Sequence, residues 1–142
     1  MGIVADIKQV VRLQNDVVRI LVDGISRAAL LGFTGNEKYL EAEICYCDSN
    51  ADSLPEDLRE AMLLGVREAF HRYAAVVGKI SKELIRQIDQ YEDLEKLIDY
   101  VTNNLPVSYE LKQQVLEAED INDRYQVIVS LLLSQVRLFH KE

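Results

Sequence analysis

The segment Gly78-Lys79-Ile80-Ser81 resembles the end of a phosphate-binding loop, in which a glycine-rich turn precedes a lysine and a hydroxyl residue. The first glycine of such a loop would stand at position 73, where the chain has Tyr73. The segment also lies in a helical pattern, so no glycine-rich turn presents backbone N–H groups to a phosphate. We expect no nucleotide site at this position.

Cys45 and Cys47 are the residues best suited to bind a metal or to form a disulfide. In a strand they share one face at a spacing that does not suit a disulfide, which favours a reducing compartment. A zinc site needs a second ligand pair, and His71 and His140 are far apart in the sequence, neither with a second histidine at ligand spacing. The sequence therefore predicts no metal site.

Four carboxylates stand close together near the last predicted helix: Glu117, Glu119, Asp120 and Asp123. Carboxylates favour helix N-termini, so a junction between two helices is normally acidic without being a site. No serine stands in a nucleophile elbow or beside a candidate base. We therefore predict no catalytic residues and no cofactor in this chain.

The composition is typical of a folded protein of one domain or two small ones: 142 residues, 49% hydrophobic and 28% charged. The net charge of -8 and the scattered basic residues argue against nucleic-acid binding, because phosphate contacts need clustered Lys and Arg. The longest apolar run, 127–133, is too short to cross a bilayer, and no signal peptide is recognised. We expect a cytoplasmic protein without a membrane partner.

The first fifty residues are predicted to be rich in strands, which we expect at 7–13, 17–24, 25–33 and 39–47. Gln14-Asn15-Asp16 would form the loop of a hairpin, and Asp23-Gly24 would separate the second strand from the third. The last strand alternates apolar and acidic residues, as a half-buried strand does. The stretch 18–33 is apolar on both faces, which is typical of strands that other elements cover on both sides.

The remainder is predicted to be helical. A long helix carries an apolar stripe at steps of three or four, formed by Leu58, Met62, Val66, Ala69, Tyr73, Val76 and Ile80. Ser53 and Glu56 have the spacing of a capping box at its start, and Gly78 lies near its end. Shorter helices follow at 81–91, 92–104 and, after Ser108 as N-cap, 109–118.

A final helix, with Asp120 as N-cap, carries Ile121, Tyr125, Ile128, Leu132 and Val136 on one stripe. The predicted fold class is therefore α+β. Residues 1–50 form a β-rich part of about four strands, and residues 51–142 form a bundle of about five helices.

Val22-Asp23-Gly24 is followed by Arg27-Ala28, and Gly2 and Ile7-Lys8-Gln9 precede it. This pattern resembles the N-terminal region of the bacterial Lon proteases, in which Val-Glu-Gly-x-x-Arg-Ala follows an approach strand. The stretch 103–125 resembles the family's series of Leu-Pro, Lys-Gln, Leu-Glu and Asp-x-x-x-Arg. The likeness runs in order through nearly all 142 residues.

The sequence departs from the family in two ways. Gln14-Asn15-Asp16 replaces the usual Pro-Asn/Asp-Gly turn, which predicts a wider hairpin. The family's first strands, its coiled-coil continuation, its ATPase module and its Ser–Lys protease module have no counterpart here. We therefore expect a fragment of a longer protein.

The resemblance implies a partial PUA-like β-barrel followed by helices, acting as a non-catalytic module of an ATP-dependent serine endopeptidase in protein quality control. Its partners would be unfolded or misfolded protein substrates and other subunits of a homohexamer, while ATP and Mg²⁺ would bind elsewhere in the parent. The candidate substrate-binding residues are Leu30, Leu31 and Phe33 on an apolar strand, which could equally be barrel core.

Two other interpretations stay open. The chain could be a free-standing helical adaptor or protein-interaction domain with no protease attached, because a fold and a motif do not fix a partner. An unrelated enzyme would need a convergent polar site, and the sequence shows none.

Overall fold

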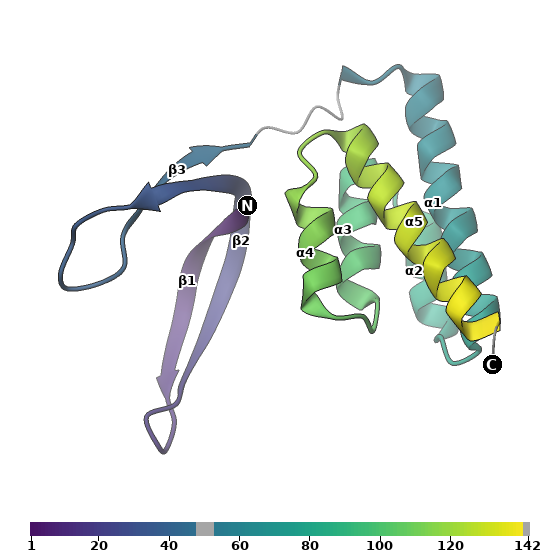
Figure 1. Ribbon diagram of the computed structural model, residues 1–142. Coiled ribbons are helices and arrows are strands. Elements are labelled where there is room, and N and C mark those ends of the chain that lie inside the picture. The colour runs from purple at the N-terminus through teal and green to yellow at the C-terminus, as the bar shows by residue number, and fades with distance from the viewer. Residues whose placement is uncertain (48–52, 141–142) are drawn as a thin grey trace. The chain divides into compact units, whose positions relative to one another are not determined.

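The structure, a computed structural model, describes residues 1–47 and 53–140 (Figure 1). The chain divides into two compact units, Met1–Asp48 and Ser49–Glu142, here called the β unit and the helical unit. The boundary predicted between residues 50 and 51 lies outside the described residues. The α+β class is confirmed, since strands occupy one unit and helices the other.

The β unit is an antiparallel sheet with the strand order β1-β2-β3. Its strands are β1 (Gly2–Arg12), β2 (Val18–Phe33) and β3 (Ala42–Tyr46). β1 and the first part of β2 form the long hairpin in Figure 1, and β3 pairs with the second part of β2. The described residues thus contain three strands where about four were predicted.

The predicted break between the second and third strands is wrong, because β2 is continuous through it. The pairs on its two sides are Ala5 with Gly24 and Val4 with Ser26, which leaves Ile25 as the extra residue of a β-bulge. A glycine in a strand often marks such a bulge, where the strand bends without ending. The sequence signal of a turn therefore corresponds to a local irregularity in one strand.

The connection between β1 and β2 places two consecutive residues in the left-handed region. Asn15 and Asp16 have φ values of 62° and 60°, and the Leu13 N–H donates to the Val17 carbonyl at 2.7 Å. Asn and Asp tolerate this conformation better than other non-glycine residues, and hairpin turns of the primed types require it. The pair Asn15-Asp16 therefore suits the connection of residues 13–17 without a glycine.

The helical unit contains five helices within its described residues, as predicted: α1 (Glu56–Val77), α2 (Lys82–Gln90), α3 (Leu94–Asn104), α4 (Tyr109–Glu117) and α5 (Ile121–His140). Gly78 ends α1 with a φ of 72°, and its N–H donates to the Ala74 carbonyl. The Ser81 hydroxyl accepts from the Leu84 N–H at the start of α2. The predicted end of α1 and the helices that follow are thus confirmed.

The N-termini of three helices differ in how they are capped. The predicted capping box is wrong, because α1 begins at Glu56 and its N-cap is Pro55, which has no polar side chain. Ser108 stands at the N-cap of α4 as predicted, but its side chain makes no capping hydrogen bond. Before α5, an Asp120 carboxylate oxygen accepts from the Asn122 N–H at 2.7 Å.

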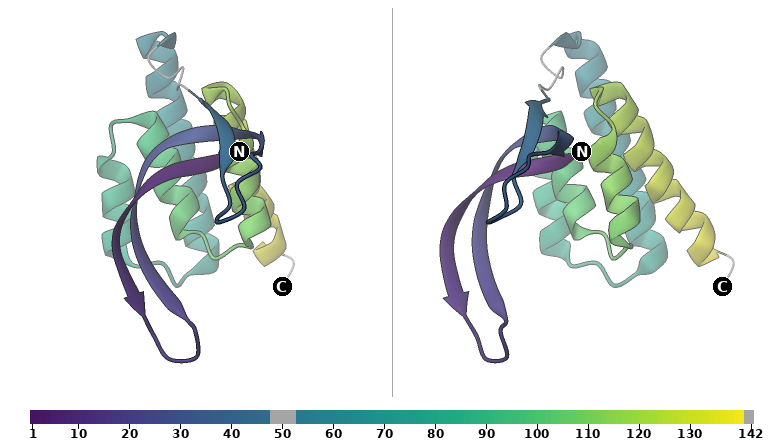
Figure 2. Two further views of the ribbon diagram at one scale, coloured as in Figure 1. Left: turned by 90° about the vertical axis from the view of Figure 1, so that its left-hand side faces the viewer. Right: turned by 60° about the vertical axis from the view of Figure 1, so that its left-hand side comes forward.

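The apolar stripes of α1 and α5 pack along each other (Figure 2), and buried residues of α2, α3 and α4 complete the core of the helical unit. Most of the two predicted stripes is buried, namely Met62, Val66, Ala69, Tyr73, Ile121, Ile128, Leu132 and Val136. Leu58 is an exception at 43% exposed, and Ile80 is partly buried beyond the end of α1. The stripe prediction therefore fails at its two ends.

Gly65 on α1 lies directly beneath the side chain of Tyr125 on α5. A Cβ atom at this position would lie 2.1 Å from the Tyr125 hydroxyl oxygen and 3.1 Å from the ring carbon that carries it. Both distances are too short for non-bonded contact, so the Tyr125 ring needs a residue without a side chain beneath it. This glycine is required by packing rather than by backbone conformation.

Gly65→Ala should lower the free energy of unfolding by about 1–2 kcal/mol, although alanine normally favours a helix interior by roughly 1 kcal/mol. Urea unfolding followed by far-UV circular dichroism measures the difference. Gly65→Ala combined with Tyr125→Phe should recover much of the loss, because the nearest clashing atom is removed. A stabilised Gly65→Ala variant would contradict the packing at this site.

Met62→Asp and Leu58→Asp provide a second test, since both residues belong to the predicted stripe but only Met62 is buried, at 4% exposed. Met62→Asp puts a carboxylate into the core and should cost several kcal/mol, at the upper end of single-site effects. Leu58→Asp should change stability by under about 0.5 kcal/mol, as surface changes usually do. Equal melting of the two variants would place Met62 outside the core.

Candidate functional site

The residues that could have carried catalytic chemistry hold the helical unit together. Gly78 and Ser81 end one helix and cap the next, so neither faces a phosphate. His71 Nε2 lies 2.7 Å from an Asp89 carboxylate oxygen and links α1 to α2 at the surface. Burial raises the pKa of the Tyr73 hydroxyl, as it does for any phenol in an apolar core.

Sulfur and carboxylate groups do not gather into a metal centre within residues 1–47 and 53–140. Cys45 is exposed and Cys47 is half-buried, both as free thiols, and Cys47 Sγ lies 3.6 Å from Met1 Sδ. The side chain of His140 lies outside the described residues. In the part of the chain that the structure describes, no helix is long and apolar enough to span a bilayer.

An ion pair between a buried guanidinium and a partly exposed carboxylate joins α3 to α5. The Arg124 side chain is 2% exposed; its Nη1 lies 3.1 Å from a Glu95 carboxylate oxygen, and its Nε donates to the Ala118 carbonyl at 3.3 Å. Removal of Glu95 would be costly, because the Arg124 charge would stay buried without this partner. Arg124, the last residue of the predicted Asp-x-x-x-Arg motif, thus has a structural role.

Exposed apolar side chains on the β unit form the most conspicuous surface feature of the chain. They come from all three strands and from the two connections, and include Ile3, Ile7, Val10, Val11, Leu13, Val17, Val18, Ile20, Leu21, Val22, Ile25, Leu30, Leu31, Phe33, Tyr39, Leu40, Ile44 and Tyr46. Contiguous apolar surface of this kind marks an interaction site in a soluble protein. The two-sided apolar pattern of 18–33 is therefore uncovered within the described residues.

The three predicted site residues lie together on the second part of β2. Leu30, Leu31 and Phe33 are 52%, 65% and 66% exposed. Leu30 pairs with Ile44 and Gly32 with Glu43, so Leu31 is the extra residue of a second bulge on this strand. A bulge re-aims side chains and locally disrupts the ladder.

The backbone of this part of β2 is also open on one side. The pairing of β1 with β2 begins at Gly2 with Ala28, so residues 30–33 pair with β3 alone among the described strands. An unpaired strand edge presents N–H and C=O groups that can accept another extended chain. Apolar side chains and an open backbone edge thus coincide at the predicted site, which the sequence pattern alone did not indicate.

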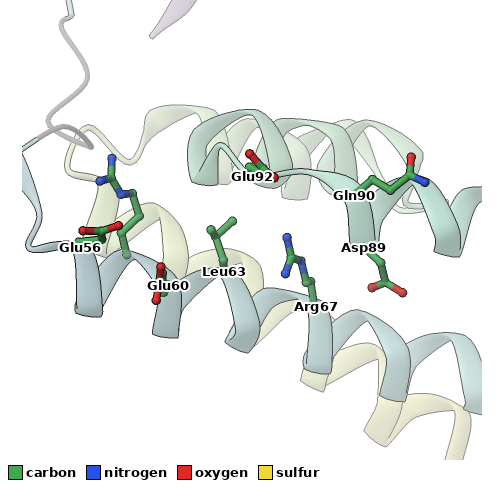
Figure 3. A pocket seen from close by; sticks show the side chains of 8 residues that line it. Glu56, Glu60, Leu63, Arg67, Asp89, Gln90 and Glu92 are labelled. Atoms are coloured by element: carbon green, nitrogen blue, oxygen red, sulfur yellow. The ribbon is translucent and has the colours of Figure 1, made fainter.

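A second feature, which sequence analysis missed, is a groove on the helical unit. It has a volume of about 820 Å³ and is lined by Glu56, Arg59, Glu60, Leu63, Arg67, Asp89, Gln90 and Glu92. Figure 3 shows Glu60, Leu63 and Arg67 on α1 opposite the end of α2 and the segment after it. Arg67 Nη2 donates to the Tyr91 carbonyl and so ties the two walls together.

The groove has a weak signature in the sequence. Its α1 residues are charged apart from the buried Leu63, and alternating charges are typical of any solvated helix face. Only the approach of the α2–α3 connection turns that face into one wall of a concavity. The groove therefore depends on tertiary contacts.

Comparison with known proteins places the chain in a family. Residues 1–134 match the family model described as ATP-dependent protease La (LON) substrate-binding domain. The chain is 30% identical to the Lon protease of Lachnoclostridium phytofermentans over 138 residues, and 31% identical to that of Clostridioides difficile over an alignment of 145 residues. These matches cover 97% and 100% of this chain but only 17% and 18% of the two relatives.

A solved structure agrees with this result at the level of the fold. The N-terminal domain of Mycobacterium avium complex Lon protease superposes with a TM-score of 0.75 at 20% sequence identity, over 92% of this chain and 68% of that one. The predicted resemblance is confirmed, and the match is to a recognition module rather than to a catalytic one. The chain belongs to the family of ATP-dependent protease La (LON) substrate-binding domains.

Proposed function

We propose that the chain binds unfolded segments of protein substrates at the open edge of β2, around Leu30, Leu31 and Phe33. The observation that carries the proposal is the coincidence of an unpaired backbone edge with three exposed apolar side chains. The parent would be a cytoplasmic ATP-dependent serine endopeptidase, with ATP and Mg²⁺ bound outside this domain. This domain would select substrates and perform no chemistry itself.

Strand addition explains how one surface could accept many substrates. Main-chain hydrogen bonds to a sheet edge are the same for every sequence, and apolar burial demands only a hydrophobic residue. An unfolded chain offers both an unpaired backbone and exposed apolar side chains. In a folded protein the backbone is already hydrogen-bonded and most apolar side chains are buried. The site therefore discriminates by folding state.

The expected affinity of one copy is modest. Burying a few hundred Å² of apolar surface contributes several kcal/mol at roughly 25 cal/mol per Å². The loss of translational and rotational freedom on association offsets much of this, so micromolar or weaker binding is expected. A homohexamer would bind one long substrate through several copies and would raise the apparent affinity by multivalency.

Assembly is a second role that the β unit supports. The hairpin formed by β1 and the first part of β2 exposes apolar residues on both of its faces, such as Val10, Val11, Ile20 and Leu21. Covering such surface against another copy would stabilise an oligomer.

The alternative role, a free-standing adaptor, is supported by the separate core of the helical unit. A phosphate-binding loop and a Ser–Lys site downstream of residue 142 in the gene would exclude that alternative.

Leu30→Asn combined with Leu31→Asn should weaken binding of a reduced, unfolded model protein by about fivefold or more, since each leucine contributes apolar burial. Fluorescence anisotropy with the labelled unfolded protein measures the change. Leu40→Asn is the matched control, because Leu40 is 88% exposed and lies outside the strands. Equal binding of the folded and unfolded model proteins, or equal loss in control and test variants, would contradict the proposed site.

The chain should form dimers or larger species at high concentration through the β unit, because open strand edges and apolar faces recruit other chains. Light scattering over a concentration series measures the mass. A clean monomer at the highest concentration, with no binding of a dye that reports apolar surface, would show that the β unit does not drive association.

A further inference from the structure

We propose that the groove between α1 and the end of α2 is a separate docking site for an extended peptide segment that carries lysine or arginine next to an apolar residue. The groove lies in the helical unit and shares no residue with the β2 edge. Its volume of about 820 Å³ falls within the usual range of about 300–1,000 Å³ for ligand pockets.

The charges that line the groove favour a cation. Carboxylates outnumber guanidinium groups by four to two, and they come from both walls: Glu56 and Glu60 from α1, Asp89 and Glu92 from the other side. One group of each sign is already engaged, since Arg67 donates to the Tyr91 carbonyl and an Asp89 carboxylate oxygen lies 2.7 Å from His71 Nε2. The lining therefore has a negative balance, in a chain whose net charge is -8.

The concave shape distinguishes these carboxylates from an ordinary solvated helix face. Leu63 is buried within the lining, so part of the groove wall is apolar rather than hydrated. A concave lining with a net negative charge attracts cationic ligands. A lysine or arginine side chain suits this lining, since its apolar stem can lie on Leu63 while its cation reaches the carboxylates.

The apolar part of the ligand has a place beside the first groove. A hollow of about 460 Å³ adjoins it, and the two share Arg67 and Asp89 in their linings. This hollow is lined in part by Leu64, which is exposed. From Glu56 to Arg72 the two concavities follow α1 for about 24 Å, enough for about seven residues of extended chain.

Other classes of ligand fit the groove less well. A phosphate or an acidic peptide would meet four carboxylates against only two guanidinium groups, those of Arg59 and Arg67. A metal ion would need at least three closely spaced donor groups, and the described residues contain no such group. The balance of charge and the shape thus point to a basic segment of a protein chain.

The test uses the whole chain and a labelled peptide of about seven residues with two arginines and one leucine, followed by fluorescence anisotropy. Glu60→Gln combined with Glu92→Gln should weaken binding about fivefold, because it removes one carboxylate from each wall. The matched control is Glu110→Gln combined with Glu119→Gln, which removes the same charge from exposed positions outside the groove. The control should change binding less than twofold.

Two further measurements separate this site from the proposed β2 edge. The Leu30→Asn and Leu31→Asn double variant should bind the basic peptide as the parent does, and peptide-induced NMR shifts should map to residues 56–72 and 89–92. Equal weakening in the groove variant and in its control would reduce the effect to net charge and overturn the proposal. Equally strong binding of the same peptide with glutamate in place of arginine would also overturn it.

Discussion

The central physical constraint in this chain is that β2 is apolar on both faces. A strand of this kind is stable in water only when other elements cover both sides, because exposed apolar surface is unfavourable. Within the described residues, β1 and β3 pair with the two edges of β2. Most of the large apolar side chains of β2 nevertheless remain exposed on its faces. The surface available for binding follows directly from this imbalance.

The helical unit has the opposite property. Its helices are apolar on one side only, and the stripes of α1 and α5 cover each other around Gly65 and Tyr125. The ion pair of Arg124 and Glu95 fixes α5 against α3. The apolar helix faces of this unit are therefore buried within the unit itself. Its charged outer face remains available for selective contacts.

As proposed here, the two units would offer different kinds of recognition to one protein substrate. An apolar strand edge selects for lack of structure and is tolerant of sequence, whereas a charged groove selects for particular side chains. Each contact would be weak by itself, and linking two weak contacts on one flexible chain raises the apparent affinity. Such an arrangement suits a domain that must bind many proteins and release them.

The sequence by itself determined what depends on local order. The period of the apolar residues predicted the buried face of α5 and most of that of α1, and Gly78 marked the end of α1, because burial stripes and helix caps are encoded in neighbouring residues. The family motifs likewise identified the fold class and the kind of module. Leu30, Leu31 and Phe33 could be named as apolar and close together, but not as exposed.

Tertiary structure decided what depends on residues far apart. Whether Gly24 ends a strand or sits beside a bulge is settled by the β1 residues opposite it, and Leu58 is 43% exposed although it continues the periodic apolar stripe of α1. Among the described strands, residues 30–33 of β2 pair with β3 alone. The groove lies where the α2–α3 connection approaches α1, and Arg67 links the two. The spacing of residues along the chain does not specify which distant segment lies opposite a given residue. The bulge, the strand edge and the groove all depend on such distant segments.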